Sequence, residues 1–271
     1  MQKVILVTGS TDGIGLVTAE MLVSQGHHVL LHGRNPAKLE AAEKSLRAIS
    51  PDGRVETYIA DLSHMEEVEA LANAVAAGHD KLDVLIDNAG IFHTPDAITG
   101  DGLDVRFAVN TIAPYLLTQR LMPLLEPNGR VVNLSSAAQS PVDPEALTGV
   151  VKLSDDFTAY AQSKLAITMW SRTMGLASGN AGPAVIAVNP GSMLGSKMVR
   201  EGFGVTGGDI RIGADILNRA ALSEEFASAS GQYFDNDAGR FAAPHADALD
   251  SGKCDEIVQA IEKVLAETTR S

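Results

Sequence analysis

Short apolar runs alternate with amphipathic stretches along most of this chain. The runs have the length of strands and are apolar throughout, rather than at every second position. Strands with this pattern are covered on both faces, which is usual in a parallel sheet flanked by helices. We therefore expect strands at residues 4–7, 29–32, 55–60, 84–86, 130–134 and 184–188, and a short further strand at 233–234.

The segments between these runs carry apolar residues at helical spacing. Pro36 suits the first turn of a helix whose apolar face continues as far as Ile49. Ser63, with Glu66 three residues later, has the pattern of an N-cap with a capping box. Longer helices are expected at residues 102–125, 158–174 and 255–266.

This alternation predicts an α/β fold, a doubly wound parallel sheet of the Rossmann type with about seven strands and helices on both faces. No internal repeat or linker divides the chain, so we expect a single domain over residues 1–271. Glycines recur between residues 191 and 212. We therefore expect this segment to form a mobile lid that closes on the site, and a plain surface loop is the alternative.

Composition and charge exclude several function classes. Hydrophobic residues make up 45% of the chain, as in globular proteins. The formal charge of −13 and the aromatic content of 4% argue against a nucleic-acid partner. No apolar run approaches the roughly 20 residues of a membrane span, and no leader is visible. Cys254 is the single cysteine, so a reducing, cytoplasmic location is expected.

A glycine-rich turn follows the first predicted strand and leads directly into a helix. Its glycines have the spacing G-x-x-x-G-x-G, and its residues are Gly9, Ser10, Thr11, Gly13, Ile14 and Gly15. Backbone N–H groups at a helix N-terminus are unpaired and favour an anion. The arrangement therefore predicts a site for the pyrophosphate of a dinucleotide.

Polar and turn-forming residues also follow the other predicted strands. They are Arg34, Asp61, Leu62, Asn88, Ala89, Gly90, Ser135, Ser136, Pro190 and Gly191. Ligands of such sheets bind outside the carboxyl ends of the strands, so we expect these residues on one rim. Tyr160 and Lys164 lie four residues apart and therefore share a helix face, where the cation would favour the phenolate.

In this order, these motifs resemble those of the short-chain dehydrogenase/reductase family, over about residues 3–200. The similarity is greatest to its retinol dehydrogenase-like and bacterial oxidoreductase branch. The resemblance implies hydride transfer between a nicotinamide cofactor and an alcohol or carbonyl, with Tyr160 as the acid/base. It implies that Lys164 lowers the Tyr160 pKa and binds the ribose, that Ser136 binds the substrate oxygen, and that Asn110 holds a relay water.

The resemblance also has consequences outside the catalytic residues. Residues 137–157 resemble the insert of that branch and are expected to form a flap. Asp87 stands where the family usually has asparagine, and Ser196 is a candidate for a threonine missing after Gly191. Subunits of the family usually pair through two long helices, here 102–125 and 158–174, so a homodimer or homotetramer is expected. No metal is required, and the seven histidines show no ligand-type cluster.

The cofactor and the substrate can be narrowed further. Gly33 and Arg34 stand where an acidic residue would select NAD, and a guanidinium suits a 2′-phosphate, so NADP is preferred and NAD possible. Asp12 argues against NADP, because many NADP-using members of the family carry a basic residue at that position. The apolar residues near the rim predict an apolar alcohol, aldehyde or ketone; they are Phe92, Met193, Leu194, Met198, Val199 and Phe203. His93 is a candidate pocket residue.

Two alternatives remain open. One is a nucleotide-binding regulator on the same fold, which would bind the cofactor without turnover. The other is a sugar-nucleotide epimerase or dehydratase, although residues 195–271 are short for the C-terminal domain such enzymes carry.

Overall fold

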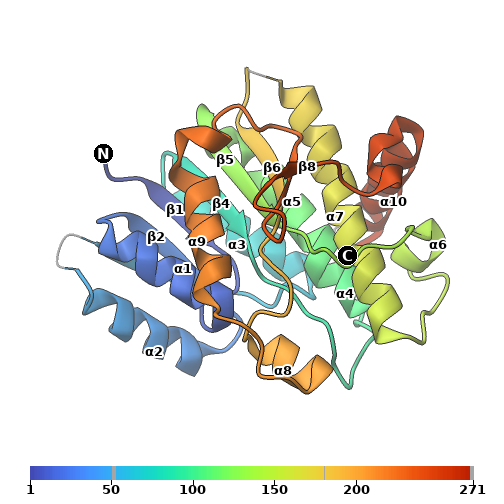
Figure 1. Cartoon of the computed structure of the whole chain (residues 1–271), viewed down its shortest axis with the longest axis horizontal. Coiled ribbons are helices and arrows are strands. Elements are labelled where there is room, and N and C mark those ends of the chain that lie inside the picture. The colour runs from blue at the N-terminus through green and yellow to red at the C-terminus, as the bar shows by residue number, and fades with distance from the viewer. Residues whose placement is uncertain (51–52, 180, 269–271) are drawn as a thin grey trace.

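An eight-stranded sheet runs through the middle of the protein between two layers of helices (Figure 1). The computed structural model describes residues 1–50, 53–179 and 181–268. The strand order is β3-β2-β1-β4-β5-β6-β7-β8, in which β7 and β8 pair antiparallel and the other neighbours are parallel. The strands are β1 (Val4–Val7), β2 (His28–Gly33), β3 (Arg54–Ile59), β4 (Leu82–Asp87), β5 (Leu125–Leu134), β6 (Ala184–Asn189), β7 (Tyr233–Asp235) and β8 (Arg240–Ala242).

The helices divide between the two faces of this sheet. One face is covered by α1 (Gly13–Ser24), α2 (Pro36–Arg47) and α9 (Arg211–Leu222). The other is covered by α3 (Met65–Gly78), α5 (Ala113–Leu121) and α7 (Asp156–Ser178), with α10 (Ser251–Thr268) packed outside α7 (Figure 1). Three short helices are α4 (Val105–Phe107), α6 (Pro144–Leu147) and α8 (Lys197–Phe203). Each face of the sheet thus has its own apolar core.

The predicted doubly wound fold is confirmed, with one strand more than expected. That strand, β8, pairs with β7 after a turn in which Gly239 has a φ of 65°. Strand β3 differs from the continuous apolar pattern because it lies at the edge of the sheet; Ile59 is 60% exposed. The Asp-Ala-Gly turn before Arg240 is a hairpin signal in the sequence that points to this extra strand.

Helices α7 and α10 extend beyond the predicted 158–174 and 255–266, and two predicted helix starts were wrong. Helix α3 begins at Met65 after His64, and Ser63 turns its hydroxyl to the Asp61 carboxylate instead of capping the helix. The helix expected at 102–125 begins only at Val105, after Asp104 accepts a hydrogen bond from the N–H of Arg106. It passes through a π-helical turn at Ala108–Ile112 and a final 3₁₀ turn at Met122–Leu124.

The predicted flap and lid segments differ in how they pack. Within 137–157, α6 buries Ala146 and Leu147 in the core beside α10, so part of the flap is a fixed element. Within 191–212, α8 and the turn after it are largely exposed, and Leu194 bridges to Gly208 at the base of the segment. The second segment therefore has fewer contacts that would hold it in place.

Candidate active site

A cavity of about 400 Å³ lies at the carboxyl ends of the parallel strands. Most of the predicted rim residues line it: Gly9, Thr11, Gly13, Ile14, Arg34, Asp61, Leu62, Asn88, Ala89, Gly90, Ser135, Tyr160, Lys164 and Pro190. Residues from the loops after six different strands therefore meet around one space. Such convergence is where ligands bind in open α/β sheets.

The glycine-rich turn is fixed tightly against the loop after β4. Gly9 has a φ of 64°, and a Cβ there would lie 2.8 Å from the Cα of Ala89. A Cβ on Gly15 would lie 2.3 Å from the amide nitrogen of Asn88. That amide donates hydrogen bonds to the carbonyls of Thr8 and Gly9, at 2.8 and 3.1 Å. Larger residues at either glycine would separate the turn from Asn88.

His32 supports the glycine-rich turn, a role that its place within an apolar strand does not reveal. Its Nδ1 accepts a hydrogen bond from the N–H of Gly9 at 3.1 Å, and its Nε2 lies 3.1 Å from the carbonyl of Ala60. Burial lowers the pKa of His32 to about 4, so the ring is neutral at pH 7 and carries its proton on Nε2. His32 therefore links the glycine turn to the end of β3.

Charged side chains gather at the β2 end of the cavity. Arg34 lies 3.6 Å from Asp61, and Lys38 lies 3.5 Å from Asp12. All four residues line the cavity. Although burial opposes it, hydrogen bonds from Ser63 and the charge of Arg34 lower the pKa of Asp61. Lys38 was missed from the sequence because it stands four residues after Arg34, inside a helix.

Tyr160, Lys164 and Ser135 line the opposite end of the cavity, and Ser136 lies beside Tyr160 outside this lining. Helix α7 presents Tyr160 and Lys164 on one face, with the Lys164 Nζ 5.8 Å from the centre of the Tyr160 ring. The Ser136 hydroxyl lies near enough to Tyr160 to influence its pKa. Ser135, the alternative of the pair, instead bonds the backbone carbonyl of Lys164 and the hydroxyl of Thr168, so it is occupied in the packing of α7.

The pKa of Tyr160 is shifted upward in this structure. Burial raises it, and the neighbouring Ser136 hydroxyl acts in the opposite direction. Burial also lowers the pKa of Lys164 to about 8. The lowering of the Tyr160 pKa that the family resemblance implies is therefore not supplied by this side chain environment alone.

Asn110 lies behind these residues, on the π-helical turn. Its Oδ1 accepts a hydrogen bond from the N–H of Ile91 at 2.8 Å, and its Nδ2 donates to the Ile91 carbonyl at 2.9 Å and to Ser163 at 3.0 Å. The side-chain amide is thus occupied in holding Ile91. A Cβ on Gly90 would lie 3.4 Å from Asn110 Oδ1 and 3.6 Å from Lys164 Nζ, so the three residues are close neighbours.

Several predicted residues support the cavity without lining it: Ser10, Gly15, Asn110, Ser136 and Gly191. Ser10 is buried and bonds the carbonyl of His32, and Gly191 has a φ of 118°. On the lid side, Ser196 and Met198 line the cavity, and Ser196 caps α8 by accepting a hydrogen bond from the N–H of Val199.

Two other residues predicted for the substrate pocket, His93 and Leu194, do not line the cavity. His93 lies outside it and pairs with Asp156. Leu194 is buried, and the side chain of Phe203 lies outside what the structure describes. Among residues 1–50, 53–179 and 181–268, no group of histidine, cysteine and carboxylate side chains is arranged to hold a metal ion. No helix in those ranges has the length and apolarity to cross a membrane.

The chain is similar to curated proteins over most of its length. It is 30% identical to retinol dehydrogenase 13 of Mus musculus over 263 residues, covering 90% of this chain and 79% of that protein. It is 33% identical to retinol dehydrogenase 12 of Mus musculus over 245 residues, covering 86% of this chain and 77% of that protein.

Solved structures show the same fold. An uncharacterized protein of Mycobacterium paratuberculosis superposes with a TM-score of 0.80 at 27% identity, covering 97% of this chain and 93% of that one. A short chain dehydrogenase of Shigella flexneri 2a complexed with NADP superposes with a TM-score of 0.68 at 25% identity, covering 87% of this chain and 97% of that one. The short chain dehydrogenase family model matches residues 3–203, and with the site above it shows that this chain belongs to the short-chain dehydrogenase/reductase family of oxidoreductases.

Proposed function

We propose that this protein transfers a hydride between NADP(H) and an alcohol or carbonyl compound, with Tyr160 as the general acid/base. The observation that carries the proposal is that Tyr160 and Lys164, with Ser136 beside Tyr160, stand at one end of a cavity that the glycine-rich turn also lines. A binding protein would need the turn but would have little use for the other three residues. A non-catalytic regulator is therefore the less favoured alternative.

The residues present fit a nicotinamide dinucleotide. The N-terminus of α1 and the glycine-rich turn face the cavity, where backbone N–H groups favour a pyrophosphate. Lys164 is placed for a ribose, and the bound cofactor would supply or accept the hydride. The protein would hold the substrate oxygen between Ser136 and Tyr160 and move one proton at the Tyr160 hydroxyl.

NADP rather than NAD is supported by two side chains. Arg34 and Lys38 line the β2 end of the cavity, and each now faces a carboxylate at 3.5–3.6 Å. A 2′-phosphate entering there would replace Asp61 and Asp12 as the partner of these two cations. The similar enzyme of Shigella flexneri is complexed with NADP, which agrees with this preference.

An apolar substrate is supported by the residues around Tyr160. Phe92, Ile91, Val109 and Met198 lie at that end of the site, and the last three line the cavity. The relatives in Mus musculus are named retinol dehydrogenases, which is consistent with a largely apolar alcohol or aldehyde.

The first test is oxidation of NADPH, beside NADH, with a panel of apolar aldehydes, cyclic ketones and quinones. We expect turnover with NADPH and a loss of roughly 10²–10⁴-fold in Tyr160→Phe, the range for removal of a positioned general acid. Binding of NADPH to Tyr160→Phe should persist. Binding without turnover of any carbonyl by the unmodified protein would instead support the regulator.

A further inference from the structure

Phe92 packs directly on the proposed acid/base residue. Its ring lies edge-on to that of Tyr160, with centroids 5.3 Å apart and an interplanar angle of 84°, and it is 8% exposed. Edge-to-face contact at this distance is the favoured geometry for two aromatic rings. Phe92 does not itself line the cavity, but its ring forms a packed wall directly beside Tyr160, which does.

The other edge of the Phe92 ring meets α8, the helix of the lid segment. A Cβ placed on Gly202 would lie 2.5 Å from both Cδ1 and Cε1 of Phe92. Real Cβ atoms do not approach so closely, so α8 touches the ring at a position where only glycine fits. The Phe92 ring thus separates α8 from Tyr160, and the size of the ring sets how closely α8 approaches Tyr160.

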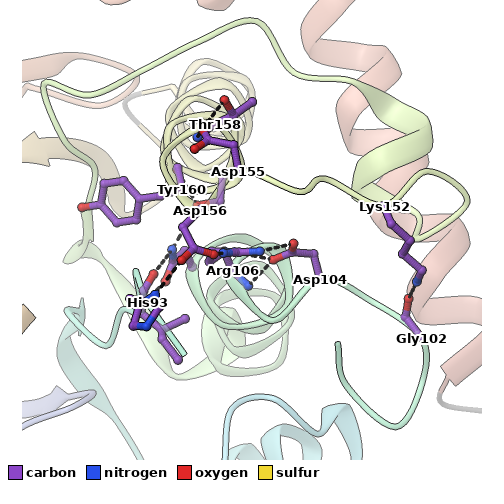
Figure 2. Close-up of polar contacts among 12 residues, drawn as sticks. His93, Gly102, Asp104, Arg106, Lys152, Asp155, Asp156, Thr158 and Tyr160 are labelled. Atoms are coloured by element: carbon purple, nitrogen blue, oxygen red, sulfur yellow. Dashed lines mark hydrogen bonds and ion pairs between the residues drawn. The ribbon is translucent and has the colours of Figure 1, made fainter. Parts of the chain in front are cut away.

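Phe92 is anchored through the residues on both sides of it. On one side, Asn110 makes two hydrogen bonds to the backbone of Ile91. On the other side, His93 Nδ1 lies 2.6 Å from the carboxylate of Asp156, one turn before Tyr160 on α7 (Figure 2). The backbone around Phe92 is therefore tied both to the π-helical turn and to α7.

The carboxylate of Asp156 is itself held by a buried ion cluster. Its second oxygen accepts a hydrogen bond from the guanidinium of Arg106, which also pairs with Asp104 (Figure 2). The side chains of Arg106 and Asp104 are only 1% and 4% exposed. A buried guanidinium shared by two carboxylates is costly to disturb, so Asp156 is a fixed point for His93.

We propose that Phe92 is the specificity-determining residue of the substrate pocket and that His93, through Asp156, is its positioning residue. This assignment rests on the proposed function and narrows its substrate class. Because the ring is fixed between Tyr160 and α8, one side of the reacting carbonyl has room only for a slender substituent. The favoured substrates are aldehydes and ketones with a hydrogen or an unbranched group on one side.

The test compares cyclohexyl methyl ketone with dicyclohexyl ketone, using kcat/KM with NADPH. The unmodified protein should prefer the methyl ketone. Phe92→Ala should lower this preference roughly tenfold or more, as expected when an apolar wall of a pocket is removed. Phe92→Leu should act in the same direction and by less, and it guards against a folding defect in Phe92→Ala.

His93→Ala and Asp156→Asn test the positioning role. Both should lower the preference for the methyl ketone, mainly through KM, and leave NADPH binding unchanged. His64→Ala is a matched control because His64 is similarly exposed, 54% against 60%, and also faces a carboxylate through Nδ1. It should leave the ratio unchanged.

The outcomes separate this assignment from the proposed function. If Phe92→Leu or Phe92→Ala still turns over the methyl ketone and its kcat/KM ratio for the two ketones is unchanged, the role of Phe92 is overturned. If His93→Ala and Asp156→Asn both change the melting temperature but not the kcat/KM ratio for the two ketones, His93 and Asp156 only support the fold and do not position Phe92. Absence of turnover with every carbonyl in the unmodified protein contradicts the proposed function, and the assignment then falls with it.

Discussion

The Nζ of Lys164 lies 5.8 Å from the centre of the Tyr160 ring and donates a hydrogen bond to the backbone carbonyl of Leu134 at 2.7 Å. Lys164 is buried and Tyr160 is half-buried, and burial favours the neutral form of each. The pKa of Lys164 is lowered to about 8, while that of Tyr160 is raised. Lys164 therefore loses its charge at a pH where oxidoreductases are routinely assayed.

This relationship predicts how the rate of carbonyl reduction depends on pH on the alkaline side. As pH rises through about 8, Lys164 becomes neutral and no longer favours the phenolate that forms when Tyr160 gives up its proton. We expect kcat/KM with NADPH to fall above that pH. In Lys164→Arg this fall should move to higher pH, since a guanidinium stays charged. A profile that is flat from pH 7 to pH 9.5 would show that Lys164 does not act in this way.

Exchanging the charge at Arg34 should change cofactor preference. Arg34→Asp removes the cation that faces a 2′-phosphate and introduces repulsion, so the NADPH/NADH ratio of kcat/KM should fall by roughly 10–100-fold, the value of one or two charged hydrogen bonds. Lys38→Met should lower it by less. Lys44→Met is the control, because Lys44 is exposed on the same helix outside the cavity. A ratio that Arg34→Asp leaves intact would remove Arg34 as the selector.

His32 should make the protein less stable in acid. Its pKa is about 4 in the folded state against 6.5 for a free histidine, so only the unfolded chain takes up this proton between those values. The free energy of unfolding should therefore fall as pH drops from 6.5 to 4, by about 3 kcal/mol at most. Urea unfolding at pH 7 and pH 4.5 measures the fall.

In His32→Phe the free energy of unfolding should fall less between pH 6.5 and pH 4, because the titrating ring is gone. This variant should also bind NADPH less tightly, because the N–H of Gly9 loses its acceptor. His64→Ala, which changes an exposed histidine, should keep the full fall. Identical slopes in the unmodified protein and His32→Phe would place the acid sensitivity elsewhere.

Asp87 should destabilise the protein at neutral pH. It is 3% exposed at the end of β4, its Oδ2 accepts a hydrogen bond from Thr118 at 3.3 Å, and burial raises its pKa well above the usual value. The folded state holds this proton more tightly, so the contribution of Asp87 to stability is fully present below about pH 4 and is lost as pH rises through the raised pKa.

Asp87→Asn keeps the shape of the side chain and removes the charge. It should raise the free energy of unfolding at pH 7 by about 1–3 kcal/mol and change it little at pH 4. Asp80→Asn, at an exposed position, is the comparison. A loss of stability at pH 7 in Asp87→Asn would mean that the buried carboxylate is needed in its charged form.

The position of α10 bears on the oligomeric state. Subunit pairing through the helices at 102–125 and 158–174 was predicted from the family resemblance, but α10 packs along α7 and reaches α5. Glu262 of α10 accepts hydrogen bonds from Tyr115 at 2.5 Å and Gln119 at 2.8 Å. This helix now covers part of the surface that pairing would use.

We therefore expect light scattering to give the mass of one chain, 28.4 kDa. Replacing Ile257 and Ile261 by aspartate should detach α10, since both are buried in its interface, and raise the average mass through the exposed apolar surface. A dimer in the unmodified protein would show that pairing occurs despite α10, in agreement with the sequence-based prediction.

The local pattern of the sequence was sufficient for the order of strands and helices and for most of the site. Apolar runs give strands because both faces of the sheet are covered, and the residues just after those runs must then share one rim. For this reason Gly9, Arg34 and Asn88 could be placed together without coordinates, whereas Tyr160 and Lys164 were brought to the site by the family resemblance.

Other features depend on contacts between residues far apart in the chain, which no local pattern encodes. The link from His32 to Gly9, the separation of α8 from Tyr160 by Phe92, and the packing of α10 over α5 are of this kind. The pKa of Tyr160 is another, since burial, which only the packed structure produces, opposes the effect predicted from its spacing to Lys164. The sequence by itself determined the fold and the chemical groups of the site; the tertiary structure decided how closely they approach and how they are charged, because desolvation and steric contact depend on the whole packed chain.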